Sequence, residues 1–100
     1  GITNDREVEG FLITNNYLYT ETRDDKTVSS KFTAIVNNNT GSDKEVKSFD
    51  IIFKDKDGKE IITLLGYVGQ TIPNDESRSI ESNVDIGLLD AYSIEYKLNK

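Results

Sequence analysis

Apolar and polar side chains alternate with a period of two in the segment Val46–Leu65, VKSFDIIFKDKDGKEIITLL. The two sets in its first half are Phe49, Ile51 and Phe53 on one side and Asp50, Ile52 and Lys54 on the other. Such alternation is typical of a strand with one buried face. The Asp57-Gly58 pair that follows can adopt the left-handed backbone of a tight turn. An apolar return through Ile61 and Leu65 completes a predicted β-hairpin.

The same period recurs in shorter segments that are separated by polar turn residues. The clearest is Thr27–Asn38, whose apolar side is formed by Val28, Ser30, Phe32, Ala34 and Val36. Further strands are predicted at Phe11–Ile13, Tyr17–Asp24, Ser77–Ile86 and Tyr92–Leu98. Turns or loops are expected at Asn15–Asn16, Asp24–Lys26, Asn37–Asp43, Gly69–Glu76 and Gly87–Asp90.

Six or seven strands with no helical period predict an all-β fold. Each strand must bury one apolar face, and two antiparallel sheets packed face to face achieve this. We therefore expect an immunoglobulin-like β-sandwich of two antiparallel sheets, and we favour it over a small barrel. The predicted core consists of Phe32, Val36, Phe49, Ile51, Phe53, Ile80, Val84, Ile94 and Leu98. Residues 1–9 are polar and unpatterned and are expected to form a linker or loose terminus, which leaves residues 10–100 as the single domain.

Composition narrows the range of functions. The net charge is -6, and residues 1–50 and 51–100 each contain 6 basic and 9 acidic side chains. There is no basic stripe for a phosphate backbone, so nucleic acid is not expected as a partner. The chain has no Cys, so it has neither a disulfide framework nor a thiol nucleophile. Its longest apolar run, Ile61–Val68, is far shorter than a membrane span.

Three segments resemble the bacterial FxLYD-type domains. They are Phe32–Thr40 with its Asn-x-Thr ending, Val46–Ile61 with its Asp-x-x-Gly turn, and the proline-containing turn Ile72–Ser77. Asp55 and Gly58 match the family pattern, whereas Ile51, Phe53 and Lys54 stand where the family has Phe, Leu and Tyr, and Ala34 stands where it favours Gly. The similarity covers roughly Thr27–Leu98. It implies an immunoglobulin-like domain that is often exported and often attached to a surface lipoprotein, and it implies no catalytic residues.

Two motifs invite a chemical interpretation that turn formation also explains. In an EF-hand register Asp55 and Asp57 would occupy ligand positions, but Phe53 and Leu64 would stand at the first and last ligand positions. We therefore interpret the segment as a hairpin turn and not as a calcium site. Asn38–Thr40 is a formal glycosylation sequon, for which a turn is again the preferred interpretation.

Catalysis finds no support in the sequence. The chain has no His and no Cys, so the usual general base and thiol nucleophile are missing. The serines have no evident activating partner, and the 18 carboxylates are spread evenly. We predict a protein that is not an enzyme, with no catalytic, metal or cofactor-binding residues and no cofactor.

The tyrosines are the remaining candidates for recognition. They are Tyr17, Tyr19, Tyr67, Tyr92 and Tyr96. Tyr92 and Tyr96 share the apolar side of their strand and are expected at the edge of the core, whereas Tyr17 and Tyr19 could face either way. The loops Asn37–Asp43 and Gly69–Glu76 are further candidates for contact, because loops on a rigid sandwich often bind partners.

These observations favour a non-catalytic interaction or spacer module of a bacterial surface protein or lipoprotein, located outside the cytoplasm. Its partner would be a protein or the cell wall, and it would contact the membrane only through an N-terminal anchor that lies outside this sequence. We expect it to be monomeric or weakly associating. The alternative is a glycan- or calcium-binding accessory domain of a larger protein.

Overall fold

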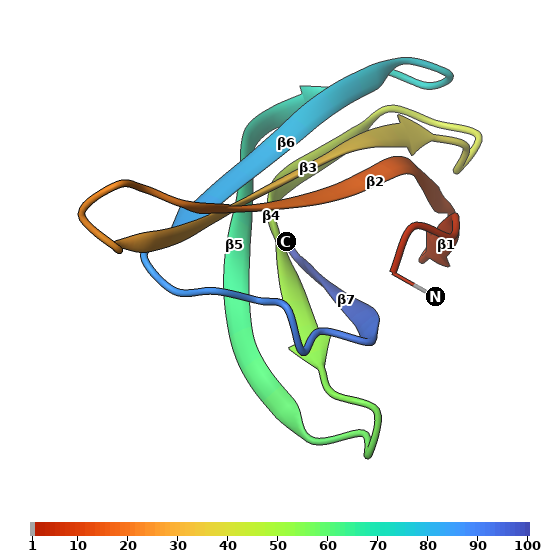
Figure 1. Cartoon of the computed structure of the whole chain (residues 1–100). Helices are drawn as coiled ribbons and strands as arrows, with labels where there is room; N and C mark the ends of the chain where they lie inside the picture. The colour runs from red at the N-terminus through yellow and green to blue at the C-terminus, as the bar shows by residue number, and fades with distance from the viewer. Residues whose placement is uncertain (1) are drawn as a thin grey trace.

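The computed structural model describes residues 2–100 as two antiparallel β-sheets packed on each other (Figure 1). The strands are β1 (Arg6–Val8), β2 (Phe11–Thr22), β3 (Val28–Asn38), β4 (Lys44–Lys54), β5 (Glu60–Ile72), β6 (Ser77–Val84) and β7 (Ser93–Asn99). One sheet has the order β1-β2-β3-β6 and the other the order β5-β4-β7. In the view of Figure 1, β4 and β5 run across β2, β3 and β6. The predicted all-β sandwich is confirmed.

The chain passes between the two sheets after β3, after β5 and again after β6. Such crossings are the kind of connection that immunoglobulin-like sandwiches use. The described part of the chain contains no helix, and so no helix that is long and apolar enough to span a membrane.

The central hairpin forms as its sequence predicts. Strands β4 and β5 pair from Lys44 with Ile72 to Lys54 with Glu60. In the turn between them, the Asp55 carboxylate accepts hydrogen bonds from the backbone N–H of Asp57 (2.9 Å) and of Lys59 (3.0 Å). Gly58 has a φ of 79°, a conformation that glycine adopts without steric cost. Local turn chemistry therefore explains this segment.

The core lies between the sheets and contains the residues that the alternating pattern selects. Seven of the nine predicted core residues are buried, and Val84 and Leu98 are half-buried and packed against them. Two edge-to-face ring pairs join the sheets: Phe11 with Phe49 at 5.7 Å between ring centres, and Phe32 with Phe53 at 5.4 Å. Each such pair contributes about 0.5–1.5 kcal/mol beyond the burial of its area.

The two sheets lie close together where β5 passes β6. Gly66 on β5 is buried, and a Cβ atom there would lie only 2.9 Å from Cδ1 of Ile80 on β6. The absence of a side chain at residue 66 therefore allows Ile80 to fill the core at this position.

The N-terminal segment differs from the expected linker. Arg6–Val8 forms β1, which pairs with Phe11–Ile13 of β2, and Ile2 packs against the core. The turn between the two strands is made by Glu9 and Gly10, whose φ angles of 48° and 88° suit a two-residue hairpin. The backbone ladder orders this segment even though its side chains are mostly polar. Gly1 lies outside the described residues.

Two expected breaks are irregularities inside longer strands. Asn15–Asn16 does not end a strand, because β2 continues through it with a bulge between Thr14 and Tyr17. The expected turn at Gly69–Glu76 is shorter than predicted. Strand β5 runs on to Ile72 with a second register shift next to Gly69, and the turn contains only Pro73 to Glu76.

Candidate functional site

The structure separates the five tyrosines into exposed and half-buried positions. Tyr17 and Tyr19 lie on the four-stranded sheet with 57% and 48% of their surface exposed. Tyr67 and Tyr92 are 66% and 64% exposed. The expectation that Tyr92 packs at the core edge is therefore wrong. This residue precedes β7, and its backbone N–H bonds to the carbonyl of Lys54 at the sheet end. Tyr96 is half-buried, as predicted.

The bulge in β2 decides which way Tyr17 and Tyr19 point. Phe11 and Ile13, at the start of the strand, are buried in the core. With unbroken alternation, Tyr17 and Tyr19 would have the same parity and would point inward. The bulge places two residues opposite one residue of β3, which reverses the parity of the rest of the strand. Asn16 consequently turns inward, and both tyrosines face solvent.

Asn16 is held in the bulge by hydrogen bonds to β7, to the N-terminal segment and to its own strand. Its side chain is 4% exposed, and its Oδ1 accepts a hydrogen bond from the Tyr96 hydroxyl of β7. Its Nδ2 donates to the backbone carbonyls of Asn4 (3.2 Å) and Ile13 (3.3 Å). Burial raises the pKa of Tyr96 above its ordinary value, and the nearby charge of Arg6 opposes this shift. These bonds satisfy the buried amide and fix the direction of the outer residues.

We call the outer surface of the four-stranded sheet around Tyr17 and Tyr19 the tyrosine face. It contains two rows across β2, β3 and β6: Tyr17, Thr33 and Glu81, and next to them Tyr19, Lys31 and Asn83. Lys31 and Glu81 form an ion pair at 3.2 Å. The face thus joins two exposed aromatic rings to hydroxyl, amide and mutually neutralised charged groups.

Side-chain hydrogen bonds centred on Asn37 connect three strands of this sheet near the end of β3. The Asn37 side chain donates to the carbonyl of Leu12 (2.8 Å) and to the Thr14 hydroxyl (3.1 Å), and it accepts from Ser77 (2.6 Å). These bonds link side chains and backbone of β2, β3 and β6. They add to the backbone ladder that fixes the positions of the three strands.

The loop predicted for contact at Asn37–Asp43 is organised by Asn38, which is fully buried. Its Oδ1 accepts from the Thr40 backbone N–H (3.0 Å) and hydroxyl (2.7 Å). Its Nδ2 donates to the carbonyls of Ser42 (2.9 Å) and Ile72 (2.8 Å). The Asn-x-Thr triplet is therefore a turn-forming motif, and its asparagine is not accessible for glycan attachment in the folded protein.

Hydrogen bonds also connect this loop to the turn that follows β5. The Gly41 N–H donates to the Asn74 side chain (3.0 Å), and the Asn74 N–H donates to the Asp43 carboxylate (2.9 Å). The two loops chosen from the sequence lie together, but several of their polar groups are occupied with each other. This end of the sandwich is a less suitable binding surface than the tyrosine face.

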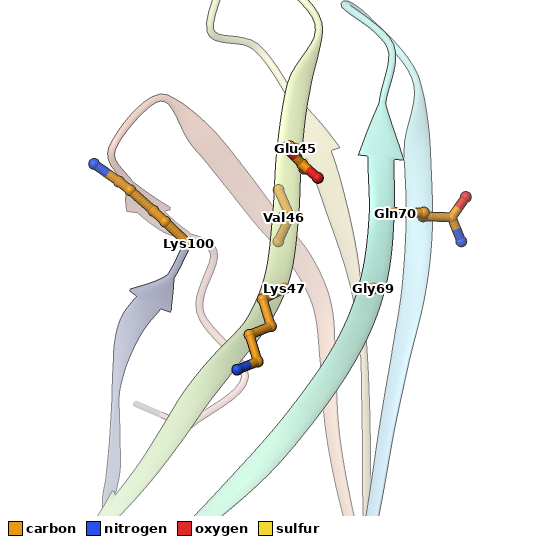
Figure 2. A pocket seen from close by; sticks show the side chains of 6 residues that line it. All are labelled: Glu45, Val46, Lys47, Gly69, Gln70 and Lys100. Carbon is orange, nitrogen blue, oxygen red and sulfur yellow. The ribbon is translucent and has the colours of Figure 1, made fainter.

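A hollow of about 420 Å³ lies beside the β5 irregularity and is lined by Glu45, Val46, Lys47, Gly69, Gln70 and Lys100 (Figure 2). Figure 2 shows the side chains of Lys47, Gln70 and Lys100 pointing in different directions. They do not converge on a common point, so the hollow lacks the arrangement of polar groups that positions a substrate.

A second hollow, of about 390 Å³, lies between the β4–β5 turn and the loop before β7. It is lined by Asp55, Lys56, Asp57, Leu89, Asp90, Ala91 and Tyr92. Leu89 is the most exposed large apolar residue of the described chain, at 86%. Among residues 2–100 no group of three or more His, Cys, Asp or Glu side chains comes together in a way that could hold a metal ion. We therefore assign no metal or cofactor to this hollow.

Comparison with protein-family models, with curated proteins and with solved structures finds no match to this chain.

Proposed function

We propose that this chain is a non-catalytic interaction or spacer module of a bacterial surface protein or lipoprotein and that it works outside the cytoplasm. The observation that carries the proposal is the tyrosine face. Tyr17 and Tyr19 are large side chains exposed side by side on one strand, which is paired with β3 at both residues, and β3 is paired in turn with β6. Exposed aromatic side chains held on a rigid support are typical of contact surfaces, because little conformational entropy is lost when they bind.

The similarity to FxLYD-type domains supports this proposal because the residues that carry the similarity have structural roles in this fold. The segments that match the family pattern are the β4–β5 turn with Asp55 and Gly58, the Asn38–Thr40 triplet at the end of β3, and the proline-containing turn Ile72–Ser77. Each of them makes local turn contacts in this fold. A motif of turn residues describes how a domain folds, so the likeness favours a shared architecture and adds no catalytic group.

The proposal that this module is non-catalytic rests on the side chains that the chain contains and on the contacts they make. The chain offers no imidazole and no thiol, and the carboxylate of Asp55 and the amide of Asn38 are occupied by the turns they stabilise. The hollow in Figure 2 has no converging polar groups. Binding is therefore the activity that this surface supports best.

Cell fractionation tests the location. Bacteria that express the full-length protein should retain it in the envelope or release it to the medium, with a processed or lipidated N-terminal region. A protein found wholly in the cytosol with an unprocessed N-terminus would contradict the proposed location. Deleting residues 2–100 from the full-length protein should abolish its envelope contacts if the domain binds, and should only shorten its reach if the domain is a spacer.

A further inference from the structure

We propose that the tyrosine face binds a linear polysaccharide of uncharged sugar rings. This inference rests on the proposed interaction function and names the class of partner. Its starting point is the geometry of Tyr17 and Tyr19. They are two residues apart on the same strand, so their side chains leave the sheet on one side about 7 Å apart.

The surroundings of the two tyrosines favour a sugar over an apolar protein surface. Protein interfaces with strong anchors usually have an apolar centre that is depleted of charged residues. Here the neighbours across the sheet are Thr33 and Lys31, followed by Glu81 and Asn83. A pyranose ring combines C–H faces, which suit the negative face of an aromatic ring, with hydroxyls, which suit hydroxyl and amide partners. Aromatic rings flanked by such groups match both parts of a sugar.

The charges of the face determine which sugars fit. The two rows contain one cation and one anion, Lys31 and Glu81, and they neutralise each other at 3.2 Å. The whole chain has a net charge of -6, which repels polyanions. An uncharged polymer avoids that repulsion and does not require the ion pair to be broken.

The open shape of the face favours a polymer over a small sugar. The hollows beside the β5 irregularity and the β4–β5 turn do not include Tyr17 or Tyr19 among their lining residues. A small ligand normally needs a concave site that buries most of its surface. A polymer can instead extend over several rows of the sheet and make many weak contacts.

Co-sedimentation of the purified domain with insoluble polysaccharides tests the inference. The probes are chitin, cellulose and curdlan, which are insoluble polymers of uncharged sugar rings. We expect binding to at least one of them. The double variant Tyr17→Ala/Tyr19→Ala should lower the affinity by roughly tenfold or more, since each stacked ring contributes on the order of a few-fold to tenfold. The variant Tyr17→Phe/Tyr19→Phe should keep most of the affinity, because the rings remain.

Tyr67→Ala is the matched control, because Tyr67 is at least as exposed as Tyr17 and Tyr19 but lies on the other sheet. Its binding should equal that of the parent. The inference is overturned if none of the three probes binds the parent at protein concentrations up to the millimolar range. It is also overturned if Tyr67→Ala weakens binding as much as the double variant does. Thermal melting of each variant confirms that it is folded.

Untreated cell envelopes separate a failure of this inference from a failure of the proposed function. A domain that binds untreated envelopes but not chitin, cellulose or curdlan has a partner of another class, such as a protein or a charged wall polymer, so the interaction function stands and the uncharged polysaccharide does not. If the domain binds none of these materials, the polysaccharide inference is wrong. Fractionation of the full-length protein then tests the proposed function independently.

Discussion

The side-chain oxygen of Asn16 in β2 accepts a hydrogen bond from the hydroxyl of Tyr96 in β7, a residue 80 positions further along the chain. This bond joins the two sheets at the bulge that turns Tyr17 and Tyr19 toward solvent. A contact between the sheets therefore supports the outward direction of the candidate binding residues.

Replacing Tyr96 with Phe should lower the free energy of unfolding by about 1–3 kcal/mol, because the buried Asn16 oxygen loses its partner. Asn16→Ala should cost at least as much, since Tyr96 then loses its acceptor and the carbonyls of Asn4 and Ile13 lose their donor. In urea denaturation, the double variant should cost less than the sum of the single variants, with a coupling of about 0.5–3 kcal/mol. Additive effects would show that the bond does not contribute to stability.

Stability should also fall at high pH through Tyr96. Burial raises the pKa of this phenol in the folded protein above its ordinary value of 10.0, so the folded state favours the protonated form. The resulting stabilisation is fully present below pH 10 and is lost as the pH rises through 10 toward the folded-state pKa. Denaturation curves from pH 8 to pH 11 should show this loss in the parent and a smaller one in Tyr96→Phe. Equal slopes for both proteins would contradict the assignment to Tyr96.

Truncation of Phe32 or Phe53 to Ala should destabilise the domain by about 3–5 kcal/mol, because each ring is fully buried and removing it leaves a cavity. A domain of this kind has a total stability of roughly 5–15 kcal/mol, so either variant should be close to unfolding. Chemical denaturation measures the loss. Tyr67→Ala, an exposed aromatic truncation, is the control and should change stability by less than about 0.5 kcal/mol.

Adding a methyl group at Gly66 should be costly, because the new Cβ would lie 2.9 Å from Cδ1 of Ile80. We expect Gly66→Ala to reduce stability by about 1–3 kcal/mol through overpacking. Ile80→Val removes the clashing methyl, so Gly66→Ala should cost clearly less in that background. An equal cost in both backgrounds would locate the effect in the backbone and not in the contact between the sheets.

Calcium should leave the thermal midpoint unchanged at millimolar concentration. The Asp55 carboxylate is engaged by two backbone N–H groups of its own turn, and Asp57 alone supplies too few oxygens for a cation that takes 6–8 ligands. A ligand that binds the native state must raise the midpoint. A clear rise in differential scanning calorimetry would therefore establish a calcium site, and Asp57→Asn would then show whether this turn provides it.

The sequence by itself determined the features that depend on neighbouring residues. The period of two places Phe32, Phe49 and Phe53 in the core, because successive strand side chains point to opposite faces. The β4–β5 turn follows from Asp55 and Gly58, whose conformations and hydrogen bonds involve only residues of the turn itself. These interactions are local, so the order of residues is enough to predict them.

The tertiary structure decided the features that depend on contacts between distant residues. Asn15–Asn16 looks like the end of a strand in the sequence, but it forms a bulge because Asn16 has hydrogen-bond partners in β7 and near the N-terminus. Leu88 lies in a short loop with no period, yet it is 2% exposed because the loop before β7 packs on the core. The outward direction of the Tyr17 side chain results from the same bulge. A hydrogen bond across 80 residues leaves no local pattern, so only the packing of the two sheets could reveal it.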